Sequence, residues 1–318
     1  MRRLNKKGFE MSFAWIFSII VGAIILFLAI YMAIKFVGIG EYKISTETSD
    51  KLAIILQPLE TSVEEAGAMT VELTGETKIF NRCYFDDVFG DDRISLSYKS
   101  LGDRWSKESA AISIKNKYIF SDEVEGKTIY IFVKPFEMPF KISDLIFVYS
   151  KRYCFINPVD SIKEEIEGIG LGNSTNMIVV DSKAECEAED VKVCFSGTGS
   201  CDILVRCEDE ECETGTVRRD SKTVYFVKSL IYGAIFSSNE EYECNVKRLI
   251  SRLSQLSKLY QKKSSYISAR GCSTGLEAEL LSLSKTAGSL KSSADLLFAK
   301  NLADTIKSKN KNLVCKLF

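Results

Sequence analysis

Residues 11–34 read MSFAWIFSIIVGAIILFLAIYMAI and contain no charged side chain. A helix of this length rises about 36 Å, which exceeds the roughly 30 Å hydrocarbon core of a bilayer. Four basic side chains precede it, namely Arg2, Arg3, Lys6 and Lys7. By the positive-inside rule they place the N-terminus in the cytoplasm and the rest of the chain outside. The sequence therefore predicts one helix that spans the cell membrane, with the lipid bilayer as its partner.

A cleaved signal peptide is the alternative interpretation, because it also begins with basic residues and an apolar run. Signal peptides have an apolar core of about 7–15 residues that ends at a small-residue cleavage site. The run in this chain is longer and is followed by FVGIG at positions 36–40, so a retained helix is favoured. Ala14, Ser18 and Gly22 repeat every four residues and could pair helices in a homo-oligomer, although small residues facing lipid are the favoured interpretation.

The segment Lys6-Lys7-Gly8-Phe9 resembles the processing site of type IV pilin precursors, in which cleavage follows the glycine. The match is partial, because the usual pattern has Glu as the fifth residue after the cut, whereas Glu10 is the second. A basic flank that orients the helix is the favoured interpretation. A processed filament subunit that begins at Phe9 is the alternative.

The composition argues against several functions. Lys and Arg (42) nearly balance Asp and Glu (43), so no overall field favours a nucleic acid as partner. Histidine is absent, which removes the commonest general base and metal ligand. We therefore predict no catalytic residue, no metal and no cofactor. An external enzyme would have to work with carboxylate, Lys, Tyr, Ser or Cys.

The hydrophobic period changes twice after the membrane. Apolar residues recur every three or four positions up to about residue 66, which predicts an amphipathic stalk helix interrupted at Pro58. Short runs rich in Val, Ile, Tyr and Phe then alternate with turn residues, which predicts antiparallel β-structure. The predicted segments are a cytoplasmic tail at 1–10, a transmembrane helix at 11–37, a juxtamembrane stalk at 38–68, a β-rich extracytoplasmic domain at 69–240 and a helical hairpin at 241–318.

The β-rich segment contains ten predicted strands and one helix, at Val159–Glu167. The apolar run Leu230–Phe236 is too short to span a membrane and is predicted to be a buried strand. The ten strands are Thr70–Leu73, Arg93–Ser97, Ala110–Ile114, Thr128–Val133, Leu145–Tyr149, Met177–Val180, Val191–Phe195, Ile203–Cys207, Gly215–Arg219 and Thr223–Val227.

The C-terminal segment has two apolar seams with alternating three- and four-residue spacing, which is typical of packed helices. The first seam is Val246, Leu249, Leu253, Leu256 and Tyr260. The second is Leu276, Leu280, Leu283, Ala287, Leu290, Ala294 and Leu297. A Ser-rich connection at 264–273 joins them, so the sequence predicts an antiparallel helical hairpin. The fold class is α+β.

All ten cysteines follow the apolar helix, as an oxidising compartment would favour. Cys194 with Cys201 and Cys207 with Cys212 are the favoured local bridges, since each pair flanks a short polar turn. Zinc is the disfavoured alternative, because there is no C-x-x-C and no His. Spacing leaves the pairing of the other six open. These other disulfide candidates are Cys83, Cys154, Cys186, Cys244, Cys272 and Cys315.

Four further motifs favour an ordinary structural interpretation. GIGLG at 168–172 follows a predicted helix, which is the wrong order for a dinucleotide loop. Acidic clusters at 86–92 and 208–211 do not fit the EF-hand pattern and are expected to be solvated turns. Ser282 and Lys285 have S-x-x-K spacing without its companion motifs. Asn173 begins the sequon Asn-Ser-Thr and is a candidate glycosylation site in an exposed turn.

Three segments carry a family resemblance: KKGFEMSFAWIFSIIVGAIILFLAIY, KPFEMPFKISDLIFVYSKRYCF (134–155) and YGAIFSSNEEYECNVKRLISRLSQL (232–256). Together they resemble a family of uncharacterised archaeal single-pass membrane proteins. The resemblance implies a cell-membrane location and an external domain, and supplies no activity.

The leading hypothesis is a non-enzymatic cell-surface protein with a structural or partner-binding role, whose protein partner is unidentified. It rests on the apolar helix, the distribution of cysteines and the lack of a catalytic motif. A type IV pilin-like filament subunit is the second hypothesis. An extracytoplasmic enzyme without histidine is the third, and a pocket lined by convergent Asp, Glu, Lys or Tyr would favour it.

Overall fold

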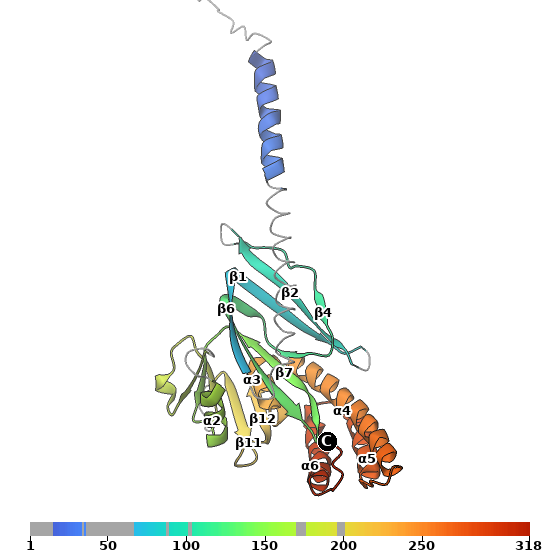
Figure 1. The fold of residues 1–318 in the computed structure, drawn as a ribbon. Coiled ribbons are helices and arrows are strands. Elements are labelled where there is room, and N and C mark those ends of the chain that lie inside the picture. Colours follow the sequence, from blue (N-terminus) through green and yellow to red (C-terminus); the bar gives the residue numbers. More distant parts are fainter. Residues whose placement is uncertain are drawn as a thin grey trace, which may run out of the picture. The chain divides into compact units, whose positions relative to one another are not determined.

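The computed structural model describes residues 15–33, 35, 67–86, 89–100, 104–169, 176–195 and 201–318. The chain divides into two compact units, Met1–Thr48 and Ser49–Phe318. The fold is α+β, with an apolar N-terminal helix, a β-rich part and C-terminal helices (Figure 1). The prediction is confirmed at this level. The predicted stalk lies outside the described residues, apart from Gly67 and Ala68, which already belong to a strand.

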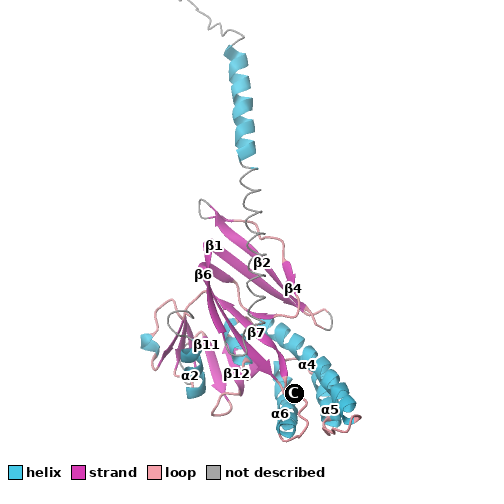
Figure 2. Ribbon diagram, viewed as in Figure 1, coloured by secondary structure: helices cyan, strands magenta, loops and turns pink. Residues whose placement is uncertain are grey.

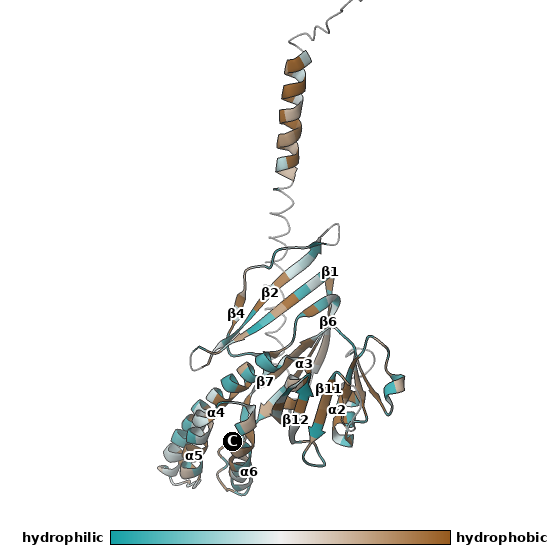
Figure 3. Cartoon of the chain, turned by 180° about the vertical axis from the view of Figure 1, so that it is seen from behind, coloured by the Kyte–Doolittle hydropathy of each residue, from teal (hydrophilic) through white to brown (hydrophobic). Residues whose placement is uncertain are grey.

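The N-terminal helix covers Trp15–Ala33 and buries none of its side chains within the chain. Figure 3 shows hydrophobic residues along most of its length. Among the described helices it is the one that is long and apolar enough to cross a membrane. This is consistent with the predicted anchor.

The first sheet has seven strands in the order β3-β2-β1-β6-β7-β5, with β4 also paired to β2 (Figure 2). Its pairs are antiparallel except for β5 beside β7. Side chains alternate between its faces, so Phe132 lies in one apolar cluster and Ile131 in another. The strands are β1 (Gly67–Tyr84), β2 (Asp91–Ser100), β3 (Arg104–Trp105), β4 (Ile112–Ile114), β5 (Tyr118–Phe120), β6 (Val124–Glu137) and β7 (Lys141–Tyr149).

The second sheet has six strands in the order β13-β12-β11-β10-β8-β9 and is mixed. β8 pairs in parallel with β9 and β10, whereas β11, β12 and β13 are antiparallel neighbours. The expectation of purely antiparallel β-structure is therefore wrong. One parallel pair, β8–β9, is joined by the helix α2 (Asp160–Ile169), a crossover of the kind that parallel strands need, and β10 also pairs in parallel with β11. The strands are β8 (Tyr153–Ile156), β9 (Met177–Val180), β10 (Val191–Cys194), β11 (Ile203–Cys207), β12 (Thr214–Arg219) and β13 (Lys222–Val227).

The ten predicted strands and the predicted helix at 159–167 each overlap an element of the same type. The segment Leu230–Phe236 is buried as predicted, but it is the helix α3 and not a strand. α3 packs against β7 of the first sheet and β13 of the second. An added Cβ at Gly233 would lie 2.7 Å from the ring of Phe120, so the close contact requires glycine. A segment buried on every side shows no periodicity by which to distinguish helix from strand.

The C-terminal helices are α4 (Asn239–Ser268), α5 (Glu277–Ser289) and α6 (Leu296–Lys311). The predicted seam is buried at Leu276, Leu280, Leu283 and Ala287. The prediction that it continues to Leu297 in one helix is wrong, because α5 ends at Ser289 and Leu297 is 44% exposed. The backbone is extended at Ser292, which interrupts the helix and changes its phase.

Arg248 of α4 is fully buried and joins the first sheet to the C-terminal helices. Its Nη1 donates to Asp92 Oδ2 at 2.6 Å, its Nη2 to the Lys117 carbonyl at 2.8 Å and its Nε to the Phe89 carbonyl at 3.0 Å. The guanidinium carbon lies 4.8 Å from the centre of the Tyr118 ring. The single charge is thereby bonded to β2 and to the segments before β2 and β5.

Neighbouring residues complete this centre. Asn245 Oδ1 accepts from Arg248 Nη1 at 2.8 Å, and Asn245 Nδ2 donates to the Ile119 carbonyl at 3.0 Å. Gly90 has φ +61°, and an added Cβ would lie 2.1 Å from the Tyr84 carbonyl oxygen and 3.1 Å from Arg248 Cδ. Only glycine fits this turn over the arginine.

We predict that Arg248→Met destabilises the protein by about 3–5 kcal/mol, because Asp92 would remain buried without its partner. The measurement is urea unfolding of the detergent-solubilised chain, followed by circular dichroism. The double variant Asp92→Asn/Arg248→Met should recover part of the loss. Lys309→Met is the control, since it removes an exposed pair with Glu279 and should cost less than about 1 kcal/mol. Equal losses for Arg248→Met and the control would contradict the prediction.

Candidate functional site

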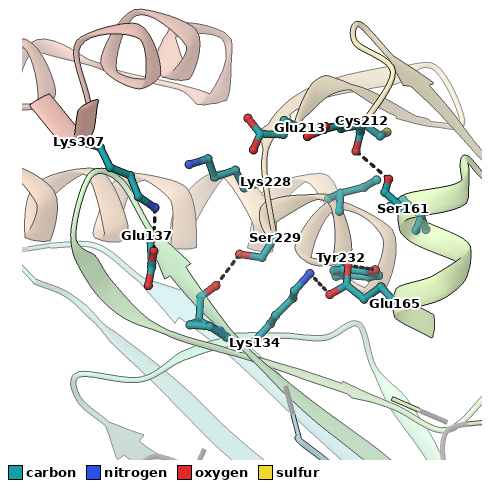
Figure 4. A pocket seen from close by; sticks show the side chains of 14 residues that line it. Lys134, Glu137, Ser161, Glu165, Cys212, Glu213, Lys228, Ser229, Tyr232 and Lys307 are labelled. Carbon is teal, nitrogen blue, oxygen red and sulfur yellow. Dashed lines mark hydrogen bonds and ion pairs between the residues drawn. The ribbon is translucent and has the colours of Figure 1, made fainter. Parts of the chain in front are cut away.

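A cleft of about 500 Å³ opens where β6, α2, the β11–β12 turn, α3 and α6 come together (Figure 4). We name it the Lys134 cleft. Its wall contains three lysines and four glutamates from these elements, together with the apolar side chains Ile162 and Ile231. The charged residues are Lys134, Lys228, Lys307, Glu137, Glu165, Glu211 and Glu213.

Lys134, Glu165 and Tyr232 form a partly buried polar group in the cleft, in which the side chain of Tyr232 is fully buried. Lys134 Nζ contacts Glu165 Oε1, and the Tyr232 hydroxyl donates to Glu165 Oε2 at 2.9 Å. Burial lowers the pKa of Lys134 to about 8, although the adjacent carboxylate favours its charged form. Burial raises the pKa of Tyr232, so its hydroxyl keeps its proton and donates. One carboxylate therefore bridges an amine and a phenol.

The rim of the cleft consists of further ion pairs. Lys307 Nζ lies 3.1 Å from Glu137, and Lys228 Nζ lies 3.8 Å from Asp304 of α6. Each cationic side chain in the wall thus has an acidic neighbour. The cleft presents both signs of charge in alternation, which does not favour a simple anion or cation as ligand.

The backbone around the cleft is unusual at two positions. Lys228 has φ +53° and Cys212 has φ +56°, both in the left-handed region that few side chains other than Asn and Asp adopt. The Lys228 amide donates to the Glu213 carbonyl at 2.7 Å, which holds the two segments together. Ser161 Oγ donates to the Glu211 carbonyl at 2.9 Å and so attaches α2 to the same turn.

The groups in the Lys134 cleft are suited to proton transfer. An amine that loses its proton near pH 8 can act as a base or as a nucleophile, and a carboxylate beside it can accept or return a proton. The sequence motifs gave no indication of this group. Its three members come from β6, α2 and α3, which are far apart in the chain.

The structure pairs all ten cysteines, with Cα–Cα distances between 4.8 and 6.1 Å. These distances lie within the usual range for disulfides. Two of the pairs, Cys194–Cys201 and Cys207–Cys212, are those that spacing favoured. The other three are Cys83–Cys244, Cys154–Cys186 and Cys272–Cys315.

The acidic cluster at 86–92 separates into different environments. Asp86 is exposed, Asp87 lies outside the described residues, and Asp92 is fully buried against Arg248. The expectation of a solvated turn is wrong for Asp92. In the 208–211 cluster, Asp209 accepts from the amides of Glu213 and Thr214 at 2.8 and 2.9 Å, as a turn residue does.

Asp92 also lies near Glu241 and Cys83. One carboxylate oxygen of each acid and the Cys83 sulfur, the atoms that could bind a metal, all lie within 4.8 Å of one another. Cys83 is bonded to Cys244 and so offers no thiolate to a metal. Glu241 accepts from the Cys83 amide at 2.8 Å. Burial raises the pKa of Glu241 to about 7 and that of Asp92 to about 6. The group is a buried carboxyl, Asp92, and a partly buried one, Glu241, next to a disulfide.

The remaining predicted sites do not converge on the cleft. Gly8, Phe9 and Asn173 lie outside the described residues. Gly168 is in the last turn of α2 and a strand follows, which is the order that argued against a nucleotide loop. Ser282 and Lys285 are exposed on α5.

Comparison of the chain with family models, curated proteins and solved structures finds no match.

We predict that Lys134 reacts with acetic anhydride as an amine with a pKa of about 8. Mass spectrometry after labelling over a series of pH values gives its profile, with the exposed Lys262 as internal reference. Glu165→Gln should shift the Lys134 midpoint to lower pH, because the carboxylate that favours the ammonium is gone. A Lys134 profile that rises in parallel with that of Lys262 would contradict the prediction.

We also predict that Glu241 makes the protein less stable as the pH rises from about 4.5 to 7. The folded state holds the Glu241 proton more tightly than the unfolded state in this window, since the pKa is raised to about 7. Its contribution is therefore present below the unfolded pKa and is lost as the pH approaches 7. Glu241→Gln should remove a decrease on the order of 1–2 kcal/mol, because solvent screens part of the effect on this partly exposed carboxyl. The measurement is urea unfolding at the two ends of the window.

Glu240→Gln is the matched control, because Glu240 is exposed and paired with Lys222. The decrease in unfolding free energy with pH should persist in this variant. An unchanged pH dependence in Glu241→Gln would show that the carboxyl is not responsible.

Proposed function

We propose that the protein is held in the cell membrane by its N-terminal helix and carries an extracytoplasmic head, defined as residues 67–318, with a structural or partner-binding role. The observation that carries the proposal is that all ten cysteines follow the helix and all are paired. Disulfides persist in oxidising compartments outside the cytoplasm. The basic flank at Arg2, Arg3, Lys6 and Lys7 supports the same orientation. We also propose membership in the archaeal single-pass family that the chain resembles.

The positions of the disulfides support a head built to remain folded outside the cell. Cys83–Cys244 joins β1 to α4 across 161 residues, and a loop of that size corresponds to about 5 kcal/mol in the chain-entropy account. Cys272–Cys315 attaches the C-terminal segment to the α4–α5 connection. The first bridge binds the first sheet covalently to α4, and the second binds the segment after α6 to the connection after α4.

A non-enzymatic role is favoured because each lysine of the Lys134 cleft has an acidic neighbour within the chain. Lys134 is engaged by Glu165, and Glu165 in turn by Tyr232. Lys307 is engaged by Glu137. Such paired groups are common in structural networks, where they also perturb pKa values.

An extracytoplasmic enzyme without histidine is the second candidate, favoured by the same cleft. It gathers an amine, a carboxylate and a phenol in a hollow large enough for a small molecule. If Lys134 is the reacting group, its labelling should fall in the presence of a ligand that fills the cleft.

We predict that iodoacetamide alkylates no cysteine in membranes taken directly from cells, and all ten after reduction. Mass spectrometry reads both samples, with the thiols of a cytoplasmic protein in the same preparation as control. Free alkylation of all ten without reductant would overturn the extracytoplasmic placement.

The same spectra give the mature N-terminus. A start at Met1 or Arg2 supports a retained anchor, whereas a start at Phe9 supports a pilin-like filament subunit.

A further inference from the structure

Two hollows lie along one side of α4, apart from the Lys134 cleft. Their volumes are about 600 and 640 Å³, and Phe85 and Lys247 line both of them. On α4 the lining residues recur every three or four positions from Glu240 to Lys258, so they form one face. The helix rises about 27 Å over the 18 steps from Glu240 to Lys258. We name the two hollows together the α4 groove.

The floor and walls of the α4 groove contain apolar surface. Phe85, which follows β1, is 39% exposed. Ile250 of α4 and Ala287 of α5 are buried beneath the groove, and Leu290 at the end of α5 is partly exposed. An exposed aromatic side chain above a packed apolar floor is a common anchor point in protein interfaces.

The charge of the α4 groove is unbalanced toward positive. Lys222 is paired with Glu240, and Glu243 accepts from the Ser293 amide at 2.9 Å but keeps its negative charge, so four lysines face two glutamates. Lys247, Lys258 and Lys291 are exposed, and none of the ion pairs formed among the described residues includes them. Three ammonium groups thus surround an apolar floor, in contrast to the Lys134 cleft, where each lysine has an acidic neighbour.

The spacing of the lysines fits a helical ligand. Lys247 and Lys258 are eleven residues apart on α4, which is close to three turns or about 16 Å. Carboxylates eleven residues apart on a second helix have the same separation. Amphipathic helices commonly bind in grooves of this kind, with apolar anchors on the floor and charges on the rim.

We propose that the α4 groove binds an acidic amphipathic helix of a partner protein. Its apolar face would rest on Phe85 and Leu290, and its carboxylates would meet Lys247, Lys258 and Lys291. The inference rests on the proposed partner-binding role and names the surface and the chemistry of the partner.

The test uses the full chain in nanodiscs of phosphatidylcholine, which carries no net charge. The probe is a fluorescent 18-residue peptide with leucines on one helical face and glutamates on the other, followed by fluorescence anisotropy. Lys247→Glu/Lys258→Glu/Lys291→Glu should weaken binding at least tenfold, and added salt should weaken binding to the wild type. Lys311→Glu changes an exposed lysine of α6 that lines neither hollow and should leave binding unchanged.

Circular dichroism checks that the triple variant is folded, and Lys247→Gln/Lys258→Gln is the milder variant, expected to weaken binding severalfold. Absence of binding, or equal binding by wild type and both groove variants, overturns the inference. So does a result in which the variants lose binding only to anionic phosphatidylglycerol vesicles, since the groove would then recognise lipid. If the peptide fails to bind but the alkylation experiment finds all cysteines paired, only the inference about the α4 groove is overturned. If that experiment finds free thiols, the proposed extracytoplasmic location is overturned.

Discussion

The burial of one guanidinium, that of Arg248, constrains how the head is assembled. A buried arginine is costly unless its donors are bonded, and these donors find a carboxylate from β2 and two carbonyls from separate turns. The three acceptors and the glycine at position 90 must therefore be in place together. This makes the first sheet and α4 one assembly, and the Cys83–Cys244 bridge fixes the same junction covalently.

Much of the fold could be predicted from the sequence because most strands are half buried. The runs at 128–133 and 215–219 show the composition and turn boundaries of strands, and both form strands. Prediction failed at one fully buried helix and at some short strands. α3 is apolar on all sides, β8 has four residues and is entirely buried, and β5 has three. Without β8, the crossover through α2 could not be recognised, so the parallel pairing was missed.

The candidate site was much less predictable than the fold. Glu165 lies in a helix predicted without any functional motif, and Tyr232 in a run predicted only to be apolar and buried. Asp92 resembled its exposed neighbours in an acidic turn, since spacing along the chain does not reveal a partner 156 residues away. Sites built from single residues of distant elements leave no local pattern, whereas a disulfide that closes a short turn, such as Cys207–Cys212, does.

The Lys134 cleft and the α4 groove differ in whether their lysines form ion pairs within the chain. This difference favours a structural role for the cleft and a ligand-binding role for the groove. In the Lys134 cleft, ammonium and carboxylate groups pair within the chain, so a ligand would have to break existing interactions. In the α4 groove, three lysines are free of ion pairs among the described residues, so an acidic ligand would add interactions without removing any. Cys244 lines this groove, and Phe85 follows Cys83 by two residues. The Cys83–Cys244 bridge therefore also positions the aromatic wall of the groove.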